Sequence, residues 1–78
     1  MQPRFFTFRI APGQDYSILL DEILMIKFQT EVDNNTTNFM VITMRSSGPI
    51  TYRFSEYKYF IDARDTWEKY LRAVGGKV

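Results

Sequence analysis

The sequence predicts an α+β fold in which an antiparallel sheet of four to five strands is covered on one face by a single C-terminal helix. Two observations predict it. Up to Phe54, apolar and polar side chains alternate with the period of two that is typical of strands, and after Phe54 the period changes to about 3.6, which is typical of an amphipathic helix. A sheet curled toward a small barrel would fit the same pattern. With 78 residues, the chain is expected to form one domain, residues 1–78.

Turn-forming residues divide the first part of the chain into the expected strands. Pro12-Gly13 ends the first strand, and the runs at residues 33–37 and 46–49 end the third and the fourth. Asp21-Glu22 interrupts an apolar run, which predicts a bulge or a turn between the second strand and the third. The strands are expected at residues 4–10, 16–20, 23–32, 39–45 and 50–54.

The register of the last three strands follows from the lengths of their loops. A six-residue loop would place Val32 opposite Phe39, and a four-residue loop would place Arg45 opposite Ile50. Directly opposed residues lie on the same face of a sheet, and a one-residue change in either loop would break the agreement between the two hairpins. The apolar face predicted in this way comprises Ile26, Phe28, Val32, Phe39, Val41, Ile50, Tyr52 and Phe54.

The segment after Phe54 is expected to be the helix. Ser55 is the expected N-cap, with Asp62 as the alternative if the helix starts late, and Gly75-Gly76 should end it. We expect its apolar stripe to cover the apolar face of the sheet. The stripe comprises Phe60, Ala63, Trp67, Tyr70, Leu71 and Val74.

The opposite face of the sheet is the candidate site. A solvated face should be polar, but this one carries three methionines and an isoleucine among basic residues. Methionine is flexible and common on surfaces that accept a partner, and an exposed apolar patch usually marks an interaction site. Closure of the sheet into a barrel would instead place these methionines in the core. The predicted partner-binding residues are Met25, Lys27, Met40, Ile42, Met44 and Arg53.

Most kinds of active site lack their residues in this sequence. It contains no histidine and no cysteine, so the usual general base, the thiol nucleophile and the ordinary zinc sets are missing. None of the four glycines has the spacing of a phosphate-binding loop. Oxygen-bearing side chains at residues 31–35 would suit Ca²⁺ or Mg²⁺, but the EF-hand spacing is absent. We therefore expect no enzymatic activity, no cofactor and no metal.

Charge and hydropathy bear on partners and location. Ten basic and nine acidic residues give a net charge of +1, whereas a duplex-binding protein usually has a marked basic excess. No apolar run approaches the roughly 20 residues of a membrane span, and no leader-like apolar segment is visible. We expect a cytoplasmic protein without membrane contact. Its expected partner is another protein or a second copy of itself, with the role of a small regulator or inhibitor.

One short phrase resembles a known family. The sequence ILLDEILMI at residues 18–26 is similar to the phrase that opens LytTR-type DNA-binding domains, and the resemblance covers nine residues. The rest of the chain lacks the histidine and the basic excess of that family. The resemblance implies nucleic-acid binding, which is the alternative function. A single-strand binder of this kind would use Arg4, Arg9, Lys27 and Arg53 around aromatic rings.

Overall fold

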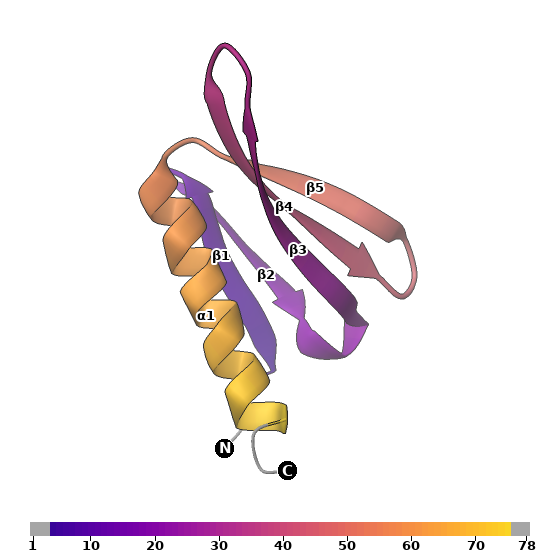
Figure 1. Cartoon of the computed structure of the whole chain (residues 1–78). Coiled ribbons are helices and arrows are strands. Elements are labelled where there is room, and N and C mark those ends of the chain that lie inside the picture. The colour runs from indigo at the N-terminus through magenta and orange to yellow at the C-terminus, as the bar shows by residue number, and fades with distance from the viewer. Residues whose placement is uncertain (1–3, 76–78) are drawn as a thin grey trace.

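The computed structural model describes the backbone of residues 4–75 and the side chains of residues 4–72. It confirms the α+β class, with five antiparallel strands followed by one C-terminal helix (Figure 1). The elements in chain order are β1 (Phe5–Ala11), β2 (Gln14–Leu19), the 3-10 turn η1 (Leu20–Glu22), β3 (Ile23–Val32), β4 (Thr36–Met44), β5 (Gly48–Phe54) and α1 (Tyr57–Gly75).

The strands form two sheets, not the single sheet that the sequence predicted. β1 pairs with β2, and β3, β4 and β5 form a separate three-stranded sheet in that order. At the junction of the two sheets, the Ser55 N–H donates to the Ile10 carbonyl oxygen (2.8 Å), but no ladder joins β1 to β5. Among the described residues the strands therefore do not close into a barrel.

Two glycines with positive φ set the geometry of two hairpins. Gly13 (φ +76°) follows Pro12 in the two-residue connection between β1 and β2, where glycine adopts the left-handed conformation without a steric cost. Gly48 (φ +78°) pairs with Met44 across a three-residue loop, residues 45–47. The left-handed conformation of Gly48 directly after this loop costs little, because glycine has no Cβ.

The predicted register of β4 is wrong. Val32 pairs with Thr36 and Met44 pairs with Gly48, so both loops contain three residues. In both hairpins the observed pairing differs from the predicted pairing by an odd number of residues. An odd shift turns β4 over relative to both neighbouring strands. Ile42, predicted on the outer face, lies between Ile26 and Ile50 on the inner face.

A β-bulge at the start of β3 decides which side chains enter the core there. Ile23 pairs with Met44 and Met25 with Thr43, so Leu24 is the extra residue. Ile23 is buried, whereas Leu24 is 54% exposed. The buried hydrophobic core comprises Phe6, Phe8, Ile23, Met40, Ile42, Phe54, Phe60 and Ala63. The peripheral Val32, predicted on the apolar face, is largely exposed near the tip of the β3–β4 hairpin.

The helix lies alongside β1 and also reaches the three-stranded sheet (Figure 1). Near the start of the helix, the centre of the Phe60 ring lies 5.9 Å from the centre of the Phe28 ring and 5.7 Å from that of the Phe54 ring. Further along, the rings of Trp67 and Tyr70 lie 5.4 and 5.8 Å from the ring of Phe6. The expected stripe thus packs against both sheets, not against one.

The ends of the helix differ in part from the prediction. The helix begins at Tyr57, two residues after Ser55, and Ser55 instead bonds to β1 through its backbone N–H. Leu71, expected in the apolar stripe, is half exposed. The side chain of Val74 and all of Gly76 lie outside the described residues, while Gly75 is the last helical residue.

An aromatic cluster joins the two sheets and gives a test by pH. The Tyr52 ring lies 5.0 Å from that of Phe8 and 5.2 Å from that of Tyr16, and burial, with a smaller effect of Tyr16, raises the pKa of Tyr52. Its contribution to stability is therefore complete below the ordinary tyrosine pKa of about 10 and is lost as the pH rises through the higher folded-state pKa. We expect Tyr52→Phe to reduce the loss of stability at alkaline pH, measured by urea unfolding at several pH values. Tyr57→Phe, at an exposed ring, is the matched control for removal of a tyrosine hydroxyl.

Candidate interaction surface

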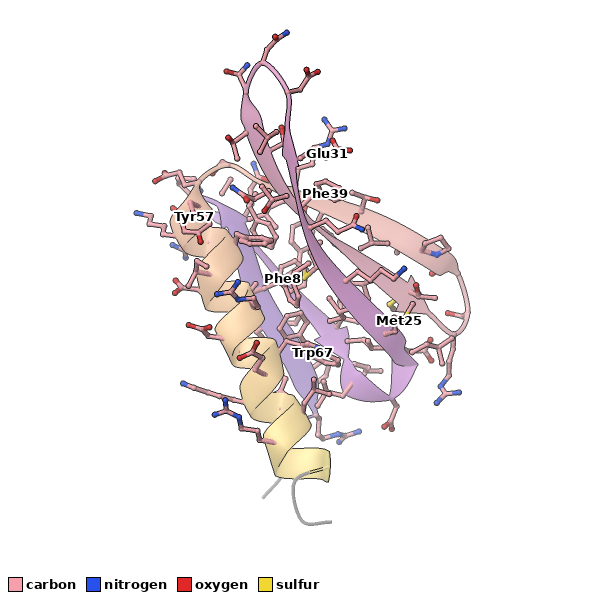
Figure 2. All side chains as sticks on the ribbon, viewed as in Figure 1. Phe8, Met25, Glu31, Phe39, Tyr57 and Trp67 are labelled. Carbon is pink, nitrogen blue, oxygen red and sulfur yellow. The ribbon has the colours of Figure 1, made fainter. Side chains whose placement is uncertain are left out.

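The face of the three-stranded sheet that points away from the core is the candidate interaction surface, and we call it the outer face. It is built from three cross-strand rows: Met25, Thr43 and Pro49; Lys27, Val41 and Thr51; and Gln29, Phe39 and Arg53. None of these nine side chains is buried. Figure 2 shows Met25, Phe39 and Glu31 along this sheet and away from α1, whereas Phe8 and Trp67 lie among the packed elements.

The structure separates the six predicted partner-binding residues into two groups. Met25, Lys27 and Arg53 lie on the outer face, as predicted. Met40 and Ile42 are 0% exposed, and Met44 packs partly buried against the same core. A side chain with no accessible surface cannot contact a partner, so β4 contributes other residues to this surface.

Phe39 and Val41 are the residues of β4 that sequence reasoning missed. They occupy the centre of the outer face because β4 is turned over relative to the predicted register. Both are partly buried, and Met25 on the same face is 46% exposed. The signal in the sequence was Gly48, a residue type that adopts positive φ easily and can therefore start a strand directly after a tight turn.

Two basic side chains flank this apolar centre. Lys27 is directly opposite Val41, and Arg53 is directly opposite Phe39. Neither forms a salt bridge within residues 4–72, where the ion pairs are Arg9 with Asp15 and Lys58 with Glu56. Glu31, paired with Thr37 toward the hairpin tip, is the acidic residue of β3 on this side. The outer face thus combines apolar side chains with an excess of positive charge.

The acidic pair at residues 21–22 has a structural role. Arg45 donates from its Nε to the Asp21 carbonyl oxygen (2.8 Å) and from its backbone N–H to the Glu22 carbonyl oxygen (2.8 Å). The Ser46 hydroxyl lies 3.0 Å from Glu22 Oε1. These bonds hold η1 against the β4–β5 loop, which agrees with the turn expected at this position.

A concave feature lies between β1 and α1. It is an open groove of about 400 Å³. One charged pair in its wall is tightly joined: Arg9 Nε lies 2.6 Å from Asp15 Oδ1, and Arg9 Nη2 lies 3.1 Å from Asp15 Oδ2. The bond from Arg9 lowers the pKa of Asp15, and Asp15 in turn raises the pKa of Arg9. The groove is lined by Thr7, Phe8, Arg9, Asp15, Tyr59, Asp62, Ala63 and Thr66.

Within the part of the chain that the structure describes, no three carboxylate side chains come together as metal ligands would, including the cluster at residues 31–35. The described helix does not have the length and apolar composition needed to cross a membrane.

Comparisons with protein-family models, with curated proteins and with solved structures found no match for this chain. The structure divides the phrase at residues 18–26, which resembles LytTR-type domains, among β2, η1 and β3.

Proposed function

We propose that this protein is a non-enzymatic protein-binding module, a small regulator or inhibitor that docks through its outer face on an acidic and apolar segment of another protein. One observation carries the proposal: the outer face has an apolar centre, Phe39 and Val41, flanked by Lys27 and Arg53, which have no salt-bridge partner among residues 4–72.

The chemistry of this face suits a protein partner. Interfaces are enriched in aromatic residues, methionine and arginine, and the strongest contacts gather near the centre of the buried area. Phe39 and Val41 supply the centre, and Met25 supplies an adaptable edge. Basic groups at the rim attract an acidic partner and raise the rate of encounter.

The charges favour a different protein over a second copy of this chain. Docking of two outer faces on one another would bring Lys27 and Arg53 of both copies together, with Glu31 as the acid available from β3. Like charges across an interface are unfavourable, so the partner that complements this face carries carboxylates.

The same face offers little for stacking of nucleic-acid bases. Phe39 is its one aromatic side chain, whereas sheet-based RNA binders stack two or three bases on aromatic rings. Of the basic residues expected to serve a single strand, Arg9 is on the other sheet and is paired with Asp15. Nucleic-acid binding is therefore an outcome that the experiment must exclude.

The proposal is tested with peptides of defined charge. A fluorescent peptide that alternates Glu with Leu and Phe is compared with the same peptide carrying Lys in place of Glu. We expect the acidic peptide to bind and the basic peptide not to bind, measured by fluorescence anisotropy. Lys27→Glu combined with Arg53→Glu should weaken binding by more than about tenfold, because two charge-assisted contacts are lost.

The control reverses the same number of charges elsewhere. Lys69→Glu combined with Arg72→Glu changes two exposed residues of α1 and should leave peptide affinity within about twofold, as expected for charges outside the contact. Equal loss in both variants would mean that only net charge matters and would contradict the proposal. Tight, steeply salt-dependent binding of oligo(dT) would mean that the partner is a nucleic acid and not a protein. A mass of twice 9.3 kDa by light scattering would indicate a second copy.

A further inference from the structure

We propose that the groove between β1 and α1 is a second binding site, which takes a primary ammonium group on a short alkyl chain. It is separate from the outer face, because β1 belongs to the two-stranded sheet and α1 lies beside it. Its volume of about 400 Å³ lies within the range of roughly 300–1,000 Å³ that is usual for small-molecule sites. An alkylamine or a lysine side chain is of suitable size for this space.

The charges in the groove leave one carboxylate available. Arg9 and Asp15 neutralise one another through two short contacts. Asp62 also lines the groove, and it forms no salt bridge with any side chain of residues 4–72. The cation one turn earlier on the helix, Lys58, lies 3.8 Å from Glu56 and 5.3 Å from the centre of the Tyr59 ring, and it does not itself line the groove. Because Arg9 is balanced by Asp15, the Asp62 carboxylate gives the lining residues a net negative charge, which favours a cation.

The helix brings hydroxyl groups to the same side as this carboxylate. Tyr59, Asp62 and Thr66 are spaced three and four residues apart, so they lie along one face of α1 above the groove. An ammonium group has three donors and no acceptor. A carboxylate with neighbouring hydroxyl oxygens is the set of acceptors that satisfies it.

The floor of the groove suits the carbon chain that carries the ammonium group. Phe8 and Ala63 line the groove from β1 and from α1, and because they are 4% and 2% exposed they leave a small apolar area accessible there. Long amines commonly place their methylene groups on apolar surface while the charged end stays polar. Two sources supply this chemistry, a free alkylamine or a lysine side chain of a peptide.

The test is a titration of isotopically labelled protein followed by amide chemical shifts. The probes are n-butylamine, Nα-acetyl-lysine methylamide and a short lysine-containing peptide, with n-butanol and butyrate as controls for the apolar chain and for the charge. We expect the amine probes to shift the amides of Thr7, Asp62 and Thr66, and the two controls to leave them in place. Stronger binding of the peptide than of the amines would identify a peptide lysine as the source, and the reverse order would identify a free amine.

A matched pair of variants assigns the effect to Asp62. Asp62→Asn keeps the shape of the side chain and should weaken amine binding about tenfold, as expected for loss of a charge-assisted hydrogen bond. Asp65→Asn removes an exposed carboxylate of the same helix that does not line the groove, and amine affinity should not change. Equal shifts with n-butanol, unchanged binding in Asp62→Asn, or no shift at millimolar amine would overturn the proposal. None of these results bears on peptide binding by the outer face.

Discussion

Met40→Asp is expected to unfold the protein. Met40 is 0% exposed in the centre of β4, between Phe28 and Tyr52. The substitution removes the packing of a buried side chain, which costs about 2–5 kcal/mol, and an unpaired carboxylate in the core costs several kcal/mol more. A domain of this length has a stability of only about 4–12 kcal/mol. Far-UV circular dichroism and urea unfolding measure the loss.

Thr51→Asp is the matched control for this prediction. Thr51 is exposed on the outer face, directly opposite Val41, so the same acidic group meets water there. We expect a cost of no more than about 1 kcal/mol, from the poor fit of aspartate to a strand. A folded, monodisperse Met40→Asp protein would place Met40 on the surface and would contradict the register of β4. That outcome would restore the methionines to the interaction surface.

The error in the predicted register has a physical explanation. A strand has two faces, so an odd error in a loop moves every side chain of the strand to the wrong side. The predicted pairing was shifted by an odd number of residues in both hairpins around β4, so the predicted alignment of β3 with β5 remained correct. Agreement between the two hairpins could not reveal the error, because it tests only the alignment of β3 with β5, on either side of β4.

The parts of the fold that depend on local pattern were predicted well. Alternation placed Lys27 and Arg53 on the face opposite Ile26 and Tyr52, and this is confirmed. The turn at Pro12-Gly13 follows from backbone preferences of those two residues alone. The division into two sheets could not be predicted in this way, since it depends on contacts between segments far apart in the chain.

The sequence predicted which strands form the outer face, but it did not predict all of the side chains exposed there. β3 and β5 contribute Met25, Lys27 and Arg53, as alternation had indicated. The contribution of β4 depended on whether Gly48 belongs to the loop or to the strand, and its pairing with Met44 makes it the first residue of β5. The predicted register placed Met40 on the exposed face and Phe39 on the core face, and the observed pairing of β4 reverses both positions.

Phe6→Ala is expected to separate α1 from the rest of the molecule. Phe6 is completely buried, and its ring lies 5.1 Å from that of Phe8, 5.4 Å from that of Trp67 and 5.8 Å from that of Tyr70. Loss of a buried phenylalanine side chain costs about 3–5 kcal/mol. At 4–8 °C per kcal/mol for a domain of this size, the melting temperature should fall by more than about 12 °C.

Phe5→Ala is the control at the neighbouring position of the same strand. Phe5 points to the other face of β1 and is half exposed, so its removal should cost about 0.5 kcal/mol or less. Trp67 fluorescence reports on the helix because this indole packs against Phe6. A red-shifted emission in Phe6→Ala before global unfolding would show that the Trp67 indole meets water, and hence that the helix detaches first. The helix would then receive little support from packing, on which most helical stability in proteins depends. Equal effects of Phe5→Ala and Phe6→Ala would contradict the packing of α1 on this face of β1.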